Sequence, residues 1–276
     1  MKKNYRTILL VGFCCCPLLF LGSCAIPLAK YTRTVQLSAP LSAGSTFAAQ
    51  THNGSITVEG ADVTDCNLTA TIVARAVTEK EAKKLAEEIK IKLEPVGNKL
   101  TAKIEKPTLM INRSVAVSLD VQVPDHTSLE LTTHNGAVEI TNITGNFNAT
   151  THNGRVTATQ VSGTAILHTH NGSIRCEEIS GDAQLKTHNG SVNVYYAESA
   201  PPVCNVSLIT HNGGIDFTAP PNFSAAVEAS THNGSVKTDL PIMVIGQVSK
   251  RKLTGTVGTG QGKLHLETHN GSIRIK

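Results

Sequence analysis

The sequence predicts an all-β fold: a single-stranded, β-helix-like solenoid of about 18-residue coils, with one amphipathic helix inserted in its N-terminal part. The tetrapeptide Thr-His-Asn-Gly occurs eight times, and its four central copies are spaced by 18 residues. Apolar and polar residues alternate over short stretches around each copy, which is typical of half-buried strands. The chain has no Trp and only 4% aromatic residues, so we expect thin core layers of small aliphatic side chains.

The N-terminus has the pattern of an export signal. A basic start is followed by the apolar run 7–21, which is too short to span a membrane but suits a signal-peptide core. The run ends in Leu21-Gly22-Ser23-Cys24, which resembles a bacterial lipobox. By that resemblance, residues 1–23 are a signal peptide, Cys24 carries a lipid and residues 24–44 are a short tether. The alternative is a plain secretory signal with a chance cysteine. By resemblance to lipoproteins, Ala25 in place of Asp after the cysteine implies a location in the outer membrane, if the organism has one.

Charge and cysteine content change when the leader is removed. Loss of Lys2, Lys3 and Arg6 lowers the number of basic residues from 25 to 22, against 21 acidic residues. With the charges nearly balanced, no nucleic-acid partner is expected. The basic cluster 250–252 is interpreted as a solvated loop. Three cysteines remain in the body of the protein beyond Cys24. This odd number excludes a disulfide framework and leaves one conceivable pair, Cys176 with Cys204.

The N-terminal β part, residues 45–130, departs from the repeat. Residues 78–90 place four apolar side chains on one face, and Thr78 with Glu81 forms a capping box, so this segment is predicted to be the helix. It would cover a strand layer or cap the end of the solenoid. Residues 114–123 alternate regularly before Pro124, which predicts a strand leading into the first regular coil.

Residues 131–276 hold the Thr-His-Asn-Gly β-solenoid repeats. Strand alternation places each motif Thr inside, His outside and Asn inside, with neighbouring Asn side chains bonded to one another. The Asn-Gly step must then break the pleat, using positive φ at Gly, and form a corner. Gaps of 23, 21 and 37 residues read as one coil with insertions, or as two coils. The predicted turn residues are Asn53, Gly54, Asn135, Gly136, Asn153, Gly154, Asn171, Gly172, Asn189, Gly190, Asn212, Gly213, Asn233, Gly234, Asn270 and Gly271.

The strand 114–124 and the following segment 129–140, with the further Asn-Gly repeats, resemble the bacterial "putative adhesin" family DUF4097. The resemblance covers roughly residues 40–276. It implies a β-helix-like fold and an envelope location, and some relatives look like envelope-stress proteins. It implies no catalytic residues. His at all eight motif positions and the inserted helix depart from the family pattern.

Outward histidines in successive coils would form a ladder with steps of about 4.8 Å. Such a ladder could bind a divalent metal through His134, His152, His170 and His188 or respond to pH, while the simpler interpretation is a duplicated corner in which the rings only stack. The sequence has no nucleophile elbow, P-loop or His-Glu-x-x-His motif, so we expect no enzymatic activity and no cofactor beyond a possible metal. The expected function is a lipid-anchored envelope module that binds a glycan or an envelope protein. Envelope-stress sensing is the alternative.

Overall fold

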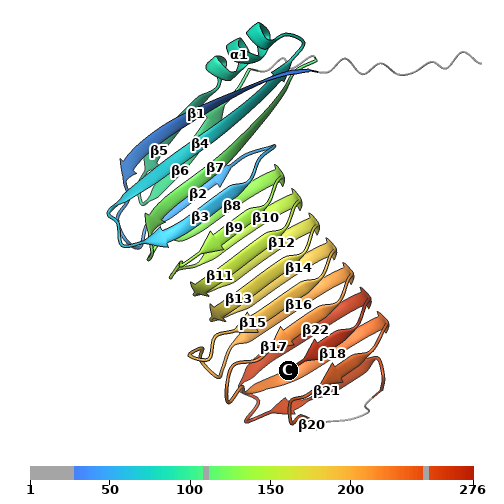
Figure 1. The fold of residues 1–276 in the computed structure, drawn as a ribbon. Coiled ribbons are helices and arrows are strands. Elements are labelled where there is room, and N and C mark those ends of the chain that lie inside the picture. The colour runs from blue at the N-terminus through green and yellow to red at the C-terminus, as the bar shows by residue number, and fades with distance from the viewer. Residues whose placement is uncertain (1–27, 108–111, 245–248) are drawn as a thin grey trace, which may run out of the picture.

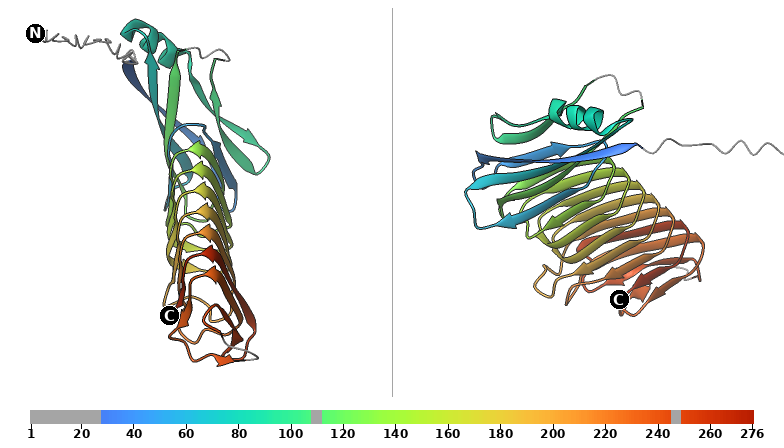
Figure 2. Two further views of the ribbon diagram at one scale, coloured as in Figure 1. Left: turned by 90° about the vertical axis from the view of Figure 1, so that its right-hand side faces the viewer. Right: turned by 45° about the horizontal axis from the view of Figure 1, so that its top comes forward.

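The computed structural model describes residues 28–107, 112–244 and 249–276. Two long sheets face each other along the molecule, with one helix at the N-terminal end (Figures 1 and 2). Sheet A contains β1 (Ala29–Pro40), β4 (Asp65–Ala76), β7 (Ser114–Pro124), β3 (Ile56–Ala61), β9 (Val138–Thr141), β11 (Val156–Ser162), β13 (Ile174–Ser180), β15 (Val192–Tyr196), β17 (Ile215–Thr218), β23 (Ile273–Ile275) and β19 (Val236–Thr238), in that spatial order. Sheet B contains β20 (Met243–Val244), β21 (Lys252–Val257), β18 (Ala225–Asn233), β22 (Gly262–Asn270), β16 (Asn205–Asn212), β14 (Ala183–Asn189), β12 (Ala165–Asn171), β10 (Phe147–Asn153), β8 (Ser128–Asn135), β2 (Thr46–Gln50), β6 (Lys99–Glu105) and β5 (Lys90–Val96). The one helix in these residues is α1 (Glu79–Glu88).

Each regular rung consists of two strands, one in each sheet, joined by the Asn-Gly corner. In the centre, β10, β12 and β14 are parallel and pair residues that are 18 apart in sequence, as Leu167 with Leu185. β11 and β13 repeat this register in sheet A. Inward Leu, Ile, Val and Ala side chains from both sheets form one continuous core. The thin aliphatic core expected from composition is therefore present, and the fold is mostly β and solenoid-like.

The first motif belongs to the same stack although it lies far away in sequence. β2 pairs with β8, and β3 pairs with β9, so residues 46–61 form the rung before the first regular one. The predicted division between residues 130 and 131 therefore coincides with no break in either sheet.

Antiparallel strands close the N-terminal end. β1 pairs with β4 along twelve residues each, and β4 pairs with β7. The expected tether 24–44 is wrong for residues 29–40, which form β1; alternate side chains such as Tyr31, Val35 and Leu37 are half-buried against the core. The lipobox and Cys24 lie outside the described residues.

The helix covers the part of sheet A that extends past the last strand of sheet B. Its Ala82, Leu85 and Ala86 are buried, and it contacts β1 and β4. At the start of α1, the Thr78 hydroxyl accepts a hydrogen bond from the Glu81 amide. At its end, the Arg33 guanidinium of β1 donates to the carbonyls of Ala86 and Ile89. Local sequence sets the helix start, and tertiary packing satisfies its last carbonyls.

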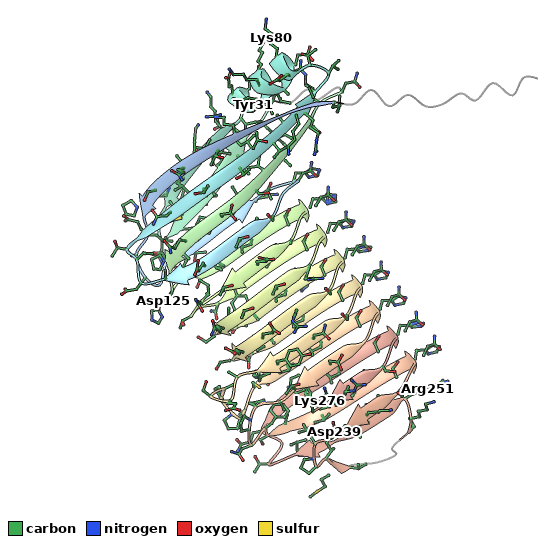
Figure 3. All side chains as sticks on the ribbon, in the orientation of Figure 1. Tyr31, Lys80, Asp125, Asp239, Arg251 and Lys276 are labelled. Atoms are coloured by element: carbon green, nitrogen blue, oxygen red, sulfur yellow. The ribbon has the colours of Figure 1, made fainter. Side chains whose placement is uncertain are left out.

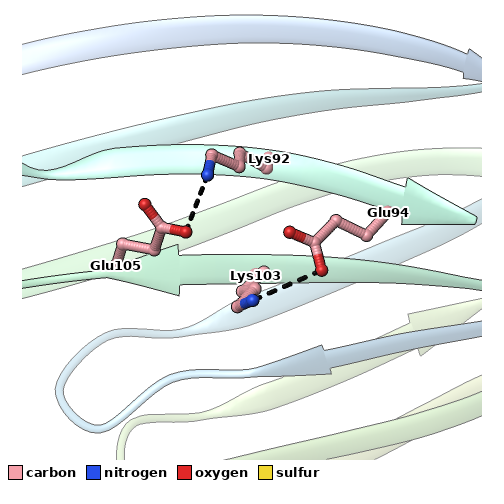
Figure 4. Close-up of polar contacts among 4 residues, drawn as sticks. All are labelled: Lys92, Glu94, Lys103 and Glu105. Atoms are coloured by element: carbon pink, nitrogen blue, oxygen red, sulfur yellow. Dashed lines mark hydrogen bonds and ion pairs between the residues drawn. The ribbon is translucent and has the colours of Figure 1, made fainter.

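β5 is the free edge of sheet B at this end, and it carries two cross-strand ion pairs with β6 (Figure 4). Lys92 Nζ lies 2.7 Å from Glu105 Oε1, and Lys103 Nζ lies 3.4 Å from Glu94 Oε2. All four groups are substantially exposed, so each pair contributes little to stability. Charges on an edge strand instead disfavour pairing with another chain.

At the C-terminal end the order of the chain differs from the order of the rungs. β22 and β23 lie between the rung of β16 and β17 and the rung of β18 and β19. The 37-residue gap thus contains the antiparallel β21 and β20, which continue sheet B beyond β18, before the chain returns to fill the skipped rung. The gap is therefore one coil plus an insertion. The last two motif copies stand in the stack in the reverse of their sequence order, with the copy of β22 before that of β18.

The three cysteines of the described residues are unpaired and buried. The pair Cys176 with Cys204 does not form. Burial raises the pKa of the Cys66 and Cys176 thiols to about 12, so these thiols are unreactive at neutral pH. They act as small apolar core residues.

Candidate functional site

The eight motif histidines form one row along an edge of the solenoid, which we call the histidine ladder. Adjacent ring centroids are 4.6–4.9 Å apart, which is the spacing of neighbouring strands. Five of the seven adjacent pairs are stacked, with interplanar angles of 2–22°. From the N-terminal end, the order is His52, His134, His152, His170, His188, His211, His269 and His232.

Each imidazole is held in place by the threonine before it. All eight motif threonines are buried, and the predicted inward Thr and outward His are confirmed. In every rung after the first, the Thr hydroxyl donates to the carbonyl of the motif glycine in the adjacent rung, as Thr169 does to Gly154 at 2.9 Å. In the first rung, Thr51 donates to the Val117 carbonyl instead. Every copy is thereby fixed to its neighbour at the same point, which aligns the rings.

The motif asparagines form a second row beside the ladder. Seven hydrogen bonds of 2.7–2.8 Å run from the Nδ2 of one Asn to the Oδ1 of the next, all in the same direction. The predicted Asn-to-Asn bonding is confirmed. The predicted inward position is wrong, because the asparagines from Asn135 to Asn270 are exposed. They lie at the corner where the strand ends, and the alternation of faces stops there.

Close backbone approach is what requires glycine at the corner. A Cβ on any of the eight motif glycines would lie 1.9–2.1 Å from a carbonyl oxygen of the adjacent rung or, for Gly54, of Val117. The expected positive φ occurs only at Gly54 and Gly190. The prediction of a Gly corner therefore holds, but its physical reason is mostly contact between rungs and not left-handed backbone.

Of the predicted metal ligands His134, His152, His170 and His188, the last three are stacked, and stacking is unfavourable for a shared metal ion. Two imidazole nitrogens that share Zn²⁺ at about 2.0–2.1 Å each can be at most about 4.2 Å apart. Equivalent nitrogens in parallel rings are separated by about the centroid distance, which is 4.9 Å for His170 and His188. Within residues 28–107, 112–244 and 249–276, no group of three or more metal-ligating side chains is found.

Two shallow hollows lie along the ladder on the side of sheet B, and seven of the eight imidazoles line them. The first, of about 600 Å³, is lined by the first three ladder rings together with Lys103, Lys106 and the apolar Val115 and Val117. The second, of about 490 Å³, is lined by the next four ladder rings with His168, Lys186 and Glu267. The hollows thus contain more basic than acidic side chains.

The basic neighbours affect two of the imidazoles. Partial burial, reinforced by His134 and Lys106, lowers the pKa of His52. Burial and Lys186 lower the pKa of His168. In both cases the nearby positive groups oppose a further positive charge.

A basic turn lies at the other end of the ladder. The Thr231 amide donates to the Arg251 carbonyl, and the Val236 amide donates to the Lys250 carbonyl, which holds residues 250–251 against the rung of His232. Arg251 projects from this end of the molecule in Figure 3. The sequence interpretation of 250–252 as an ordinary solvated loop missed this placement, because only the antiparallel β21 brings the cluster back to the last rung.

A family model matches residues 32–276, which includes both capped ends and all eight motifs. The chain belongs to the Toastrack DUF4097 family. The resemblance to this family that the sequence motifs indicated is confirmed over nearly the whole described part of the chain. No curated protein is recognisably similar to this chain.

Several solved structures align with most of this Toastrack chain, at low identity and low TM-score. A "putative cell adhesion protein" from Clostridium sporogenes has 11% identity and a TM-score of 0.42, and covers 88% of this chain and 99% of its own. A "putative adhesin" from Bacteroides fragilis has 13% identity and a TM-score of 0.41, covering 88% and 97%. A "putative lipid binding protein" from Parabacteroides distasonis has 11% identity and a TM-score of 0.40, covering 90% and 96%. These values are too low to transfer any function.

Proposed function

We propose that this Toastrack protein is a lipid-anchored binding module of the bacterial cell envelope, of the "putative adhesin" type and without catalytic activity. The observation that carries the proposal is the histidine ladder. It presents the same imidazole and amide groups at every rung, at a constant spacing, and most of them are exposed. A surface that repeats along a line suits a ligand that repeats along its own length, such as a glycan chain.

The anchoring part of the proposal rests on Cys24 and its distance from the first strand. β1 begins at Ala29, so only four residues lie between Cys24 and the sheet, five residue steps in all. Five extended residues span less than about 18 Å, which would keep the N-terminal end of the solenoid at the membrane surface. Several acyl chains on one cysteine give stable anchoring where a single chain is marginal. Among the described residues, no helix is long and apolar enough to cross a membrane. Placement in the outer membrane follows from Ala25 and is part of the proposal.

The anchor can be tested by fractionation. Cys24→Ser is expected to move the protein from the membrane fraction to the soluble fraction and to abolish incorporation of a labelled fatty acid. Cys16→Ser, within the leader, is the matched control and should change neither. Labelled lipid that persists in Cys24→Ser would refute the anchor.

The binding part can be tested on a glycan array with the full chain purified in detergent. Repetitive glycans are expected to bind the wild-type protein and to lose binding in His170→Gln/His188→Gln. His126→Gln removes an exposed histidine that lies outside the ladder and outside both hollows, and it serves as control. Binding that is equal in all three proteins would refute a ligand at this edge. Specific capture of an envelope signalling protein in a pull-down would favour the stress-sensing alternative.

A further inference from the structure

We propose that the histidine ladder is a binding strip for a linear polyanion, and that the polyanion binds together with protons taken up by the imidazoles. This inference rests on the proposed function, because it names the chemical class of ligand for the same edge. The ligand would lie along the solenoid axis, across successive rungs. The shared chemistry is a chain of phosphate or carboxylate groups, from either a phosphate polymer or an acidic polysaccharide.

The first argument is the density of titratable groups. Eight imidazoles lie in one uninterrupted row of roughly 34 Å, given a strand spacing of about 4.8 Å. Imidazole is the side chain best suited to exchange a proton between about pH 5 and pH 8, so a polyanion lying along the row can bind together with protons in this range. Adjacent positive charges at this spacing repel each other, so the free row resists full protonation. A polyanion removes this resistance, which couples its binding to proton uptake.

The second argument is the character of the flanking groups. Both ends of the ladder carry fixed positive charge: Lys106 lines the hollow beside His52, and Lys250 with Arg251 adjoins the rung of His232. The described residues pair none of these three with a carboxylate. A row of neutral rings bounded by fixed cations attracts an anionic chain even before the rings are protonated.

Other charged groups face the ladder within the hollows. Lys103 is paired with Glu94 at 3.4 Å, so its contribution is reduced. His168 and Lys186 line the second hollow and have no carboxylate partner among the described residues. Glu267 is the one acidic side chain in the two linings, and it lies 3.5 Å from His265, which offsets it when that histidine is protonated. The balance along the strip is therefore positive.

The third argument is that the stacking makes the charges geometrically regular. Every ladder ring except His52 follows a buried Thr that is bonded to the adjacent rung, and every Asn beside a ring is bonded to its neighbour. The strip is therefore organised before any ligand arrives, which lowers the ordering cost of binding a long, repetitive chain. The exposed Asn amides provide neutral donors and acceptors next to each ring.

The test uses the full chain in detergent and three probes: polyphosphate, polygalacturonate and neutral dextran of matched length. We expect polyphosphate or polygalacturonate to bind at least about tenfold more tightly at pH 5.5 than at pH 7.5, because imidazole charge develops in this interval. Affinity should fall with added salt. The difference between the two anionic probes identifies which source of negative charge is preferred. Calorimetry at pH 6.5 in two buffers of different ionisation enthalpy should report net proton uptake by the wild-type protein.

Two pairs of variants make the test specific. His170→Gln/His188→Gln should lose most of the pH-dependent gain, whereas His170→Arg/His188→Arg should bind more tightly at pH 7.5 and depend less on pH, because guanidinium is always charged. His126→Gln, outside the ladder and both hollows, should behave as the wild type. Dextran binding that equals polyanion binding, and is lost in the Gln pair, would overturn this inference and leave the proposed function intact. Polyanion binding without proton uptake, or with the same pH dependence in the Gln pair, would also overturn it. Absence of ladder-dependent binding to every probe and to the glycan array would overturn both.

Discussion

In the central rungs each strand lies on the strand 18 residues before it, whereas at both ends the chain leaves that order. The centre is built from one contact set, repeated: a buried Thr bonded to a Gly carbonyl, an Asn bonded to an Asn, and a Gly that allows the backbones to touch. The N-terminal end uses long antiparallel strands and a helix, and the C-terminal end uses an antiparallel hairpin and a rung placed out of sequence order. The repeated contacts propagate the stack, and the irregular segments end it.

Ending the stack matters because a solenoid exposes unpaired strand edges at both ends. β1 and α1 cover one end, and the charged β5 forms the edge of the other sheet there. At the C-terminal end, β20 is only two residues long, which leaves little edge for another chain to extend. The exchange of β18 and β22 adds a further constraint, because the last strands of the chain are held on both sides.

The largest expected effect comes from deleting residues 262–276. In a solenoid whose chain order follows its rung order, loss of the last rung would affect one neighbour. Here β22 lies between β16 and β18, so the deletion removes one partner of each strand and detaches β18 and β21 from the rest of the stack. We expect a loss of at least about 5 kcal/mol of unfolding free energy at this end, comparable to the stability of a small domain. Hydrogen exchange should show β18 unprotected in the truncated chain, and protection equal to wild type would contradict the observed strand order.

The next effect uses two adjacent glycines of one corner. A Cβ at Gly213 would lie 2.1 Å from the Gly190 carbonyl oxygen, whereas at Gly214 the nearest atom is the Ser272 carbonyl oxygen at 3.2 Å. Gly213→Ala should therefore lower the unfolding free energy by about 3 kcal/mol or more, since two backbones must separate. Gly214→Ala should change it by less than about 1 kcal/mol, because the lost flexibility of the unfolded chain offsets a small adjustment. Chemical denaturation measures both changes in unfolding free energy. Similar values for the two variants would mean that contact between rungs is not the reason for glycine at this position of the motif.

The regular centre could be predicted from sequence because its contacts repeat there. The 18-residue period gave the rung length, and the alternation around Leu167 and Leu185 gave the inward side of each strand. The same alternation gives the wrong face for the asparagines. The strand ends at Asn171, where the chain turns the corner, and the sequence pattern does not show whether the last strand residue still follows the alternation. The ladder was predictable as soon as the rungs were assumed to stack.

The ends could not be predicted in the same way. A period contains no information about which copy lies next to which, so the position of His269 between His211 and His232 depends on tertiary packing alone. The strand at residues 29–40 did have a readable signal, because Tyr31, Val35 and Leu37 alternate with polar residues. Proximity to the proposed lipid site favours a tether for this segment, whereas its alternation favours the strand that forms. The basic groups at the two ends of the ladder could not be predicted either. Lys106 and Arg251 lie outside the repeated motifs, and only the fold brings them next to the ladder.

The smallest effect compares one amide in the centre with one at the end. Asn171 accepts from Asn189 and donates to Asn153, whereas Asn233 only donates, to Asn270. Asn171→Ala removes two hydrogen bonds and leaves two unpaired groups, and Asn233→Ala removes one. Because the row is exposed and water can replace the lost partners, we expect a cost of about 1 kcal/mol for the central residue and roughly half of that for the terminal one. Thermal unfolding monitored by circular dichroism can resolve the difference. If the two variants are equally destabilised, the asparagine row does not act through bonds to both neighbours, and the threonine-to-glycine bonds alone would have to hold the rings in line.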